Sequence, residues 1–347
     1  MKRYNHITEK TASLMNIMQA VWNAEKHCGR RRSYKEQVDA FNAHFYENIA
    51  IIQKILLTGD WPFHGYRMFE RRQHEKVRKI DWNPSFIDSV IQHAIYQTAG
   101  KILEKSCIID TFSGFKKRGM TYGAKRVRKF LKTLKGKPIY IWKADIKGYY
   151  EHIQIDVLYN MIERKFKDRT MLKLFHTLLY SHPNGLPIGN LMSQVLANFY
   201  MNEIDHWAKE VFGMEGYFHF CDDFVAISDD KQKLKRFALA FAHRIDSMGL
   251  WLKPNQQVFP ITRYGIDFMG YVFRRYETRL RRCIERGFRR RMHLYDKHPC
   301  KHTYSSVASY YGWCKHITHG EILWNKVTGG RTTRQLYEEA KHADKSA

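Results

Sequence analysis

Apolar residues in the first part of the chain recur at spacings of three and four. One such stripe runs through Val38, Phe41, Phe45, Ile49, Ile52 and Leu56. This spacing predicts a single amphipathic helix, which Gly59 and Pro62 would end. A second stripe follows Ser85 and Asp88, whose spacing resembles a capping box at the start of another helix.

Shorter apolar runs alternate with these helical stripes. Residues 138–144 predict a strand that ends at Asp145, and residues 217–228 predict a hairpin around Cys221-Asp222-Asp223. Residues 264–276 predict a second hairpin, while residues 61–82 are hairpin-like or extended. Further helices are predicted over 193–210, over 234–248 and after Arg279. The interleaved pattern indicates an α/β or α+β core followed by a basic helical C-terminal segment.

Composition narrows the class of protein. Lys and Arg number 59 against 34 Asp and Glu, which gives a net charge of +25, and 44% of the residues are hydrophobic. This apolar fraction supports a packed core, and no run of about 18 apolar residues predicts a membrane span. Six scattered cysteines and a polar N-terminus favour a cytoplasmic location. The excess of positive charge favours a nucleic acid as the partner.

Three aspartates stand where buried strands end or meet. Asp145 closes an apolar strand, and Asp222 and Asp223 lie between Phe220 and Phe224. Burying a carboxylate is costly unless a cation neutralises it, and Mg²⁺ prefers oxygen ligands. Two such ions would suit in-line attack at phosphorus. The pair at 229–230 differs because it precedes a Lys-rich helix, so helix capping is its simplest role.

Two motifs that contain these aspartates resemble those of a known family. Asp145-Ile146-Lys147-Gly148-Tyr149-Tyr150 resembles the first catalytic motif of reverse transcriptases, and Phe220-Cys221-Asp222-Asp223 resembles their aromatic-x-Asp-Asp motif. The motifs follow the family's order, and the resemblance extends from Arg78 to Phe273. It implies an RNA-directed DNA polymerase that uses two Mg²⁺ ions. The implied catalytic residues are Asp145, Asp222 and Asp223, and the implied metal ligands are Asp145, Ile146, Asp222 and Asp223.

The resemblance also implies an architecture. The expected fold is an α+β right-hand polymerase with fingers, a palm of antiparallel sheet and helices, and a helical thumb. We expect an N-terminal helical extension over residues 1–70, fingers and palm over 71–275, and a basic helical thumb over 276–347.

The segment from Leu186 to Gln194 departs from the usual reverse transcriptase pattern, Gln-Gly-x-x-x-Ser-Pro. Here Ile188 replaces the Gln and Gln194 replaces the Pro. This variant, together with the modest chain length, resembles the diversity-generating retroelement branch, which is bacterial or prophage-encoded. The resemblance implies copying of a template-repeat RNA into cDNA that is mutagenized opposite adenines, for diversification of a variable gene. The implied partners are template RNA, cDNA, dNTPs and a small, basic, oligomeric accessory variability protein.

The same resemblance implies which residues bind the nucleotide. They are Lys76, Arg78, Tyr150, Ile188, Gly189 and Gln194. Arg78 matches the fingers arginine that holds the triphosphate in a bidentate manner, and Lys76 would assist it. Tyr150 occupies the steric-gate position, where a ring would clash with a 2′-hydroxyl. Ile188 cannot donate the hydrogen bond that a glutamine offers, so mispairs would be penalised less. For Tyr150 and Ile188 the alternative is plain apolar packing.

Other motifs point to the nucleic acid. Phe268, Met269, Gly270 and Tyr271 match the primer grip of the family, a tight hairpin broken from helix by glycine. Two basic groups match nucleic-acid-binding positions, namely Lys116, Lys117 and Arg118, and Arg289, Arg290 and Arg291. Solvated surface charge is the alternative for the individual lysines. The family's protonating lysine falls near Lys253, but the register leaves its identity open.

Several rival functions remain to be weighed. A zinc site is conceivable at Cys300, His302, Cys314, His316 and His319, although the spacing is not a standard one. A non-catalytic RNA-binding protein would not need the set of three aspartates. A retron or group II intron-like reverse transcriptase without a mutagenic role is the closest alternative. An RNA replicase is disfavoured by Tyr150.

Overall fold

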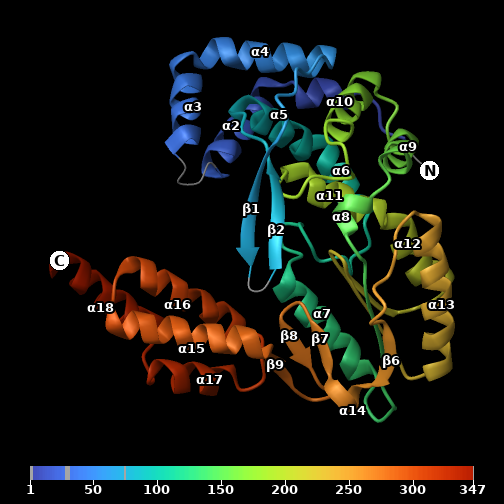
Figure 1. Cartoon of the computed structure of the whole chain (residues 1–347), viewed down its shortest axis with the longest axis vertical. Helices are drawn as coiled ribbons and strands as arrows, with labels where there is room; N and C mark the ends of the chain where they lie inside the picture. Colours follow the sequence, from blue (N-terminus) through green and yellow to red (C-terminus); the bar gives the residue numbers. More distant parts are fainter. Residues whose placement is uncertain (1–2, 28–31, 74–75, 347) are drawn as a thin grey trace. The chain divides into compact units, whose positions relative to one another are not determined.

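The computed structural model describes residues 3–27, 32–73 and 76–346 (Figure 1). The chain forms two compact units, each built from separate stretches of sequence. The first comprises residues 1–109, 145–213 and 239–254, and the second comprises residues 110–144, 214–238 and 255–347. The division into consecutive segments at residues 70 and 275 stays a prediction.

The first unit begins with four helices, α1 (Ile7–Thr11), α2 (Leu14–His27), α3 (Arg32–Ala43) and α4 (Phe45–Thr58). The single helix expected over residues 38–56 is wrong, because the chain leaves helical geometry at His44, where φ is −121° and ψ is 42°. The apolar spacing continues across this break, since the rings of Phe41 and Phe45 still meet edge to face at 6.2 Å. The predicted stop is confirmed at Gly59, whose φ of +74° is left-handed.

The extended segment that follows is a hairpin. Strands β1 (Arg67–Gln73) and β2 (Lys76–Trp82) pair antiparallel. Helix α5 (Phe86–Ile95) continues through the π-helical turn η1 (Tyr96–Gly100) into α6 (Lys101–Ser106). Ser85 caps α5 by accepting a hydrogen bond from Asp88 N at 3.2 Å, as predicted. The Asp88 carboxylate instead accepts from Trp61 Nε1 and His64 N, each at 2.9 Å.

The remaining helices of the first unit lie within its second stretch of sequence, residues 145–213. They are α8 (Tyr149–His152), α9 (Ile155–Lys165), α10 (Arg169–Leu179), α11 (Leu191–Tyr200), α12 (Asn202–His206) and the π-helical η2 (Trp207–Val211). One continuous helix over 193–210 is therefore wrong, because helix α11 ends at Tyr200 and the geometry changes again at Trp207. Helix α13 (Lys231–Ser247) contributes residues to both units.

The second unit is organised around two sheets. The first has the strand order β4 (Gly216–Phe220), β5 (Asp223–Ser228), β3 (Tyr140–Asp145), β6 (Gln257–Pro260). The second is antiparallel, with β7 (Ile266–Phe268), β8 (Tyr271–Phe273) and β9 (Thr278–Leu280) in that order. Helices α7 (Met120–Thr133) and α14 (Ile261–Tyr264) complete this part. The strand ending at Asp145 and the two hairpins are thus confirmed.

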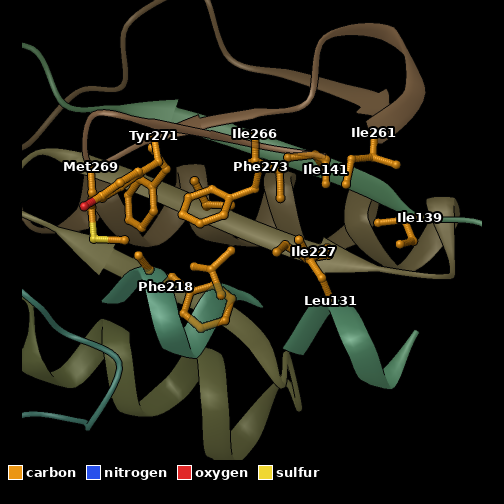
Figure 2. Packing of buried hydrophobic residues seen from close by; sticks show 14 of the residues in the cluster. Leu131, Ile139, Ile141, Phe218, Ile227, Ile261, Ile266, Met269, Tyr271 and Phe273 are labelled. Carbon is orange, nitrogen blue, oxygen red and sulfur yellow. The ribbon is translucent and has the colours of Figure 1, made fainter. Parts of the chain in front are cut away.

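One apolar cluster joins these elements. Figure 2 shows Leu131 of α7 below the sheet residues Ile141 and Ile227, and Phe218 of the first sheet and Phe273 of the second belong to the same cluster. Each of these five side chains is at most 2% exposed. Burial of this size contributes about 1.5–3 kcal/mol per side chain, so the two sheets and α7 form one core.

The C-terminal helices have a core of their own. Helices α15 (Arg282–Lys297), α16 (Lys301–Cys314), α17 (Gly320–Thr328) and α18 (Thr333–Ser346) bury Phe288, Met292, Tyr295, Val307, Cys314, Trp324, Leu336 and Ala340. The basic helical segment is therefore confirmed, and so is the α+β class. Within the described ranges, every helix is too short or too polar to cross a bilayer.

Candidate active site

Asp222 and Asp223 lie at the turn between β4 and β5, which we call the catalytic hairpin. Phe220 pairs with Asp223, so the chain reverses over Cys221 and Asp222. Cys221 has a φ of +56°, which is strained for a residue other than glycine. Two side chains brace this strained residue, because His219 Nε2 lies 2.7 Å from its carbonyl oxygen and Ser113 Oγ lies 2.7 Å from its sulfur.

The loop of residues 111–119 is attached to the same hairpin. Phe112 N donates to His219 O and His219 N donates to Asp110 O, each at 3.0 Å. Lys116 and Lys117 of this loop are exposed, and the Arg118 guanidinium lies 4.1 Å from the centre of the Phe115 ring. The structure thus brings the predicted basic loop to the catalytic hairpin.

Asp145 ends β3 and forms an ion pair with Lys253. Backbone pairing brings this lysine there, because Lys253 N donates to Asp145 O at 2.7 Å and Lys147 N donates to Trp251 O at 2.8 Å. The sequence left the register of this lysine open, and the structure identifies Lys253 as the one that contacts Asp145. The Ile146 side chain is a hydrocarbon without a ligand atom and is fully buried, so only the main-chain carbonyl group of Ile146 is a possible metal ligand.

Asp223 has a cationic neighbour that our reading of the sequence missed. Lys143 Nζ lies 3.3 Å from Asp223 Oδ1, and it also donates to the main-chain oxygen of Asp267 at 2.7 Å. Residues two apart on a strand share a face, so the strand pattern places Lys143 on the Asp145 side of β3. It does not show that Lys143 reaches Asp223.

In the first unit, the loop of residues 185–190 contacts the segments that carry most of the predicted nucleotide-binding residues. Leu186 N donates to Tyr150 O at 2.8 Å, and Asp81 N donates to Ile188 O at 2.9 Å. This loop thus connects the turn that carries Tyr150 to the end of β2. Strand β2 presents Arg78 on its exposed surface and begins at Lys76, whose side chain lies outside the described part.

Two glycines allow this close packing. Gly185 has a φ of +53°, and a Cβ there would collide with the main chain at Tyr150. Gly189 has a φ of +116°, and a Cβ would press on the side chain of Ile80 in β2. Only glycine adopts these conformations at low cost. Gly189 therefore shapes the loop against β2, which accounts for its place in the motif.

A polar network holds the same loop at its far end. Asn190 accepts from Met192 N at 3.1 Å, which caps α11, and donates through Nδ2 to Tyr66 Oη at 2.8 Å. Tyr66 Oη lies 3.2 Å from Ser181 Oγ, and burial raises the pKa of Tyr66. Gln194 follows in α11, where it is partly buried. Neither Tyr66 nor Asn190 was assigned a role from the sequence, although Asn190 lies within the segment from Leu186 to Gln194.

The predicted primer-grip segment is the turn between β7 and β8. Phe268 pairs with Tyr271, and the two residues between them, Met269 and Gly270, have φ values of +52° and +83°. Two successive positive φ values are typical of a type I′ hairpin turn. The tight hairpin is thus confirmed. The side chains of Met269 and Tyr271 point into the core (Figure 2), so contact with a primer stays a prediction.

With this geometry described, comparison with known proteins identifies the family. The family model described as "Reverse transcriptase (RNA-dependent DNA polymerase)" matches residues 74–273. The chain belongs to the reverse transcriptase family. Both catalytic motifs, the loop of residues 185–190 and the primer-grip hairpin lie within the matched region.

Curated relatives agree with this assignment. The chain is 27% identical over 174 residues to the group II intron-encoded protein LtrA of Lactococcus lactis subsp. cremoris, and this match covers 46% of this chain and 28% of that protein. It is 25% identical over 176 residues to protein YkfC of Escherichia coli K12, covering 47% of this chain and 45% of that protein. The chain thus spans less than half the length of these relatives.

A solved structure supports the fold. The structure of apo telomerase from Candida tropicalis superimposes with a TM-score of 0.51 at 11% identity, covering 82% of this chain and 59% of that chain. Together with the family match, this likeness confirms the right-hand polymerase fold.

The C-terminal arginines that the sequence predicted as nucleic-acid contacts lie on α15. Arg289, Arg290 and Arg291 are exposed, while Phe288 and Met292 face the core. Arg289 Nη2 is paired with Glu285 Oε1 at 2.8 Å. Two of the three predicted contacts, Arg290 and Arg291, therefore present their charge without an ion pair to a carboxylate in the described part of the chain.

The predicted metal ligands do not form a preassembled cluster. Across residues 3–27, 32–73 and 76–346, no group of three or more His, Cys, Asp or Glu side chains is arranged to hold a metal ion. The zinc hypothesis is therefore unsupported: Cys300 caps α16, and burial raises the pKa of the Cys314 thiol to about 11. At the catalytic aspartates, ammonium groups occupy the neighbourhood of the carboxylates, with Lys253 at Asp145 and Lys143 at Asp223.

Proposed function

We propose that the chain is an RNA-directed DNA polymerase that copies template RNA into cDNA from dNTPs. The observation that carries this proposal is the placement of the aspartates on one sheet. Asp222 lies in the turn of the catalytic hairpin, Asp223 begins β5, and Asp145 ends β3, the neighbour of β5 in that sheet. We assign catalysis of phosphodiester formation to these three carboxylates.

The donor set fits Mg²⁺. The carboxylates of Asp145, Asp222 and Asp223 and the carbonyl group of Ile146 offer the oxygen ligands that this ion prefers. Lys253 pairs with Asp145 and Lys143 pairs with Asp223. A positive group is therefore already stabilised beside each of these two carboxylates. When bound, two ions would activate the primer 3′-hydroxyl and stabilise the pyrophosphate that leaves.

The chain's own residues would do the remaining work. Arg78, which is exposed on β2, would bind the triphosphate with its planar guanidinium. Tyr150 would exclude ribonucleotides by contact with the 2′-hydroxyl. We assign Lys253 to supply a proton to the leaving pyrophosphate, because it is the lysine that reaches Asp145.

We further propose the mutagenic role, in which a bacterial enzyme in the cytoplasm copies a template-repeat RNA with errors opposite adenines. Ile188 supports this proposal. Its carbonyl group accepts from Asp81 N, and its side chain offers no hydrogen bond to an incoming base. A small basic accessory variability protein would be the partner. The likeness to a group II intron-encoded protein makes an intron-like, non-mutagenic reverse transcriptase the competing function.

Primer extension on an RNA template with Mg²⁺ and dNTPs tests the polymerase assignment. We expect Asp222→Ala to lower the extension rate by about 10³-fold, which corresponds to about 4 kcal/mol of lost transition-state stabilisation. Asp230→Ala is the matched control, because Asp230 accepts from Gln232 N and Lys233 N at the start of α13 and has no catalytic assignment. Extension by the Asp222→Ala enzyme at the wild-type rate would exclude the proposed function.

A further inference from the structure

Lys143 makes two contacts that bridge different hairpins of the second unit. Its ammonium group lies 3.3 Å from Asp223 Oδ1 in the catalytic hairpin and donates to Asp267 O at 2.7 Å in the β7–β8 hairpin. Both side chains of the ion pair are mostly buried, with 29% of the Lys143 and 22% of the Asp223 side chain exposed. Such a pair is screened less by solvent than a surface salt bridge.

The two hairpins also touch through their rings. Phe220, which precedes the catalytic turn, meets Phe268 of the β7–β8 hairpin edge to face with ring centroids 6.3 Å apart. This apolar contact fixes the distance between the hairpins but offers no directional restraint at the carboxylate. Lys143 adds an ion pair to the Asp223 carboxylate and a hydrogen bond to Asp267 O, so one ammonium group contacts both hairpins.

The β7–β8 hairpin is itself attached to the C-terminal helices. Arg281 Nη2 pairs with Asp267 Oδ1 at 2.6 Å, and Arg281 N donates to Gly270 O at 2.9 Å. Arg281 immediately precedes α15. The chain of contacts therefore runs from Asp223 through Lys143 to Asp267, and from there through Arg281 to the start of the basic helices.

We propose that Lys143 is a positioning residue that couples the primer-grip hairpin to the catalytic hairpin. A primer end held at residues 268–271 is thereby kept at a fixed distance from Asp223. The coupling itself is a property of the fold, whereas its consequence for primer extension rests on the proposed function. In this proposal Lys143 acts through Asp223 and the backbone of the β7–β8 hairpin, and it does not itself contact the dNTP or the primer.

Hydrogen exchange on the full chain without nucleic acid tests the coupling directly. We expect Lys143→Met to speed amide exchange of residues 266–273 about tenfold, as for loss of a charge-assisted hydrogen bond. Lys143→Arg keeps the charge and several donors, so it should exchange like the wild type. Lys135→Met, at an exposed lysine beyond α7, is the matched control. Unchanged exchange in Lys143→Met overturns the proposal, whether or not the chain polymerises DNA.

Steady-state primer extension tests the consequence. Lys143→Met should lower kcat about tenfold and leave the KM for dNTP within twofold, because the nucleotide-binding residues Arg78 and Tyr150 lie outside these hairpins. The Lys143→Arg enzyme should recover kcat to within threefold of the wild type. A tenfold rise in the KM for dNTP with kcat unchanged would overturn the proposal. An inactive wild-type chain would instead count against the proposed function, and hydrogen exchange would still decide the coupling.

Discussion

At the scale of single residues, Ile188 offers the sharpest test of the mutagenic role. Its carbonyl group is held by Asp81 N, so a substitution of its side chain leaves the loop anchored. Ile188→Gln restores a side chain that can hydrogen-bond beside the incoming nucleotide. We expect misincorporation opposite template adenines to fall about tenfold, because a site that requires a hydrogen bond rejects partners that lack it. Sequencing of cDNA pools made by both enzymes measures this difference.

Leu191→Gln is the matched control for Ile188→Gln, since it adds the same side chain three residues away at an exposed position. Its error spectrum should equal that of the wild type. Identical spectra for Ile188→Gln and the wild type would show that Ile188 only fills an apolar gap.

The sequence identified residues that interrupt an apolar pattern. Asp145 and the Asp222-Asp223 pair were recognisable because carboxylates are rare beside buried strands. Lys143 was not, because a lysine near a strand end usually faces solvent, and Lys253 was named only through the family resemblance, with its register left open. Their roles follow from pairings between β3 and residues 251–253, and between β3 and the hairpins. Such long-range pairings leave no local signal in the chain.

At the scale of elements, Asp168 connects the start of the chain to α10. It caps α10 by accepting from Met171 N at 3.0 Å, and it also accepts from Ile7 N and Thr8 N, each at 2.8 Å. Burial opposes the charged carboxylate, but the hydrogen bonds from Thr8, Met171 and Ile7 outweigh it and lower the pKa of Asp168. The ionised form is thus favoured in the folded state.

Asp168→Asn should therefore destabilise the protein by about 2 kcal/mol at neutral pH, because an amide oxygen binds these donors less strongly than a carboxylate does. A lowered pKa contributes stability above the unfolded value of about 3.9 that is lost as the pH falls through the folded pKa. The difference in free energy of unfolding should consequently shrink below about pH 4. Urea unfolding at several pH values measures it, with Asp246→Asn at an exposed position as the control. Equal stability of Asp168→Asn and the wild type at neutral pH would contradict this account.

The helix boundaries show where local patterns stop being informative. Apolar spacing predicted the buried faces of α3 and α4 correctly, since Phe41 and Ile52 are buried. It could not show the break at His44, because the stripe continues across it. Hairpins were easier, because Gly270 and the Asp222-Asp223 pair mark the turns between apolar runs.

At the scale of the whole molecule, the net charge of +25 predicts steep salt dependence of RNA binding. Each phosphate contact releases counterions and contributes about 0.7–0.9 to the slope of log K against log salt concentration. The structure sharpens this expectation on α15. Arg289 is paired with Glu285, whereas Arg290 and Arg291 are exposed without such a pair among the described residues.

Removing both exposed arginines should therefore change the slope more than removing the paired one. We expect the double variant Arg290→Ala with Arg291→Ala to lower the magnitude of the slope by about 1.4–1.8, the value for two phosphate contacts. Arg289→Ala should lower it by much less, because Glu285 already compensates that charge. Fluorescence anisotropy with a primer–template duplex at several salt concentrations gives the slopes. Equal slopes for the double variant and the wild type would show that the nucleic acid does not contact Arg290 and Arg291 of α15. Its phosphates would then be bound by basic residues on another surface.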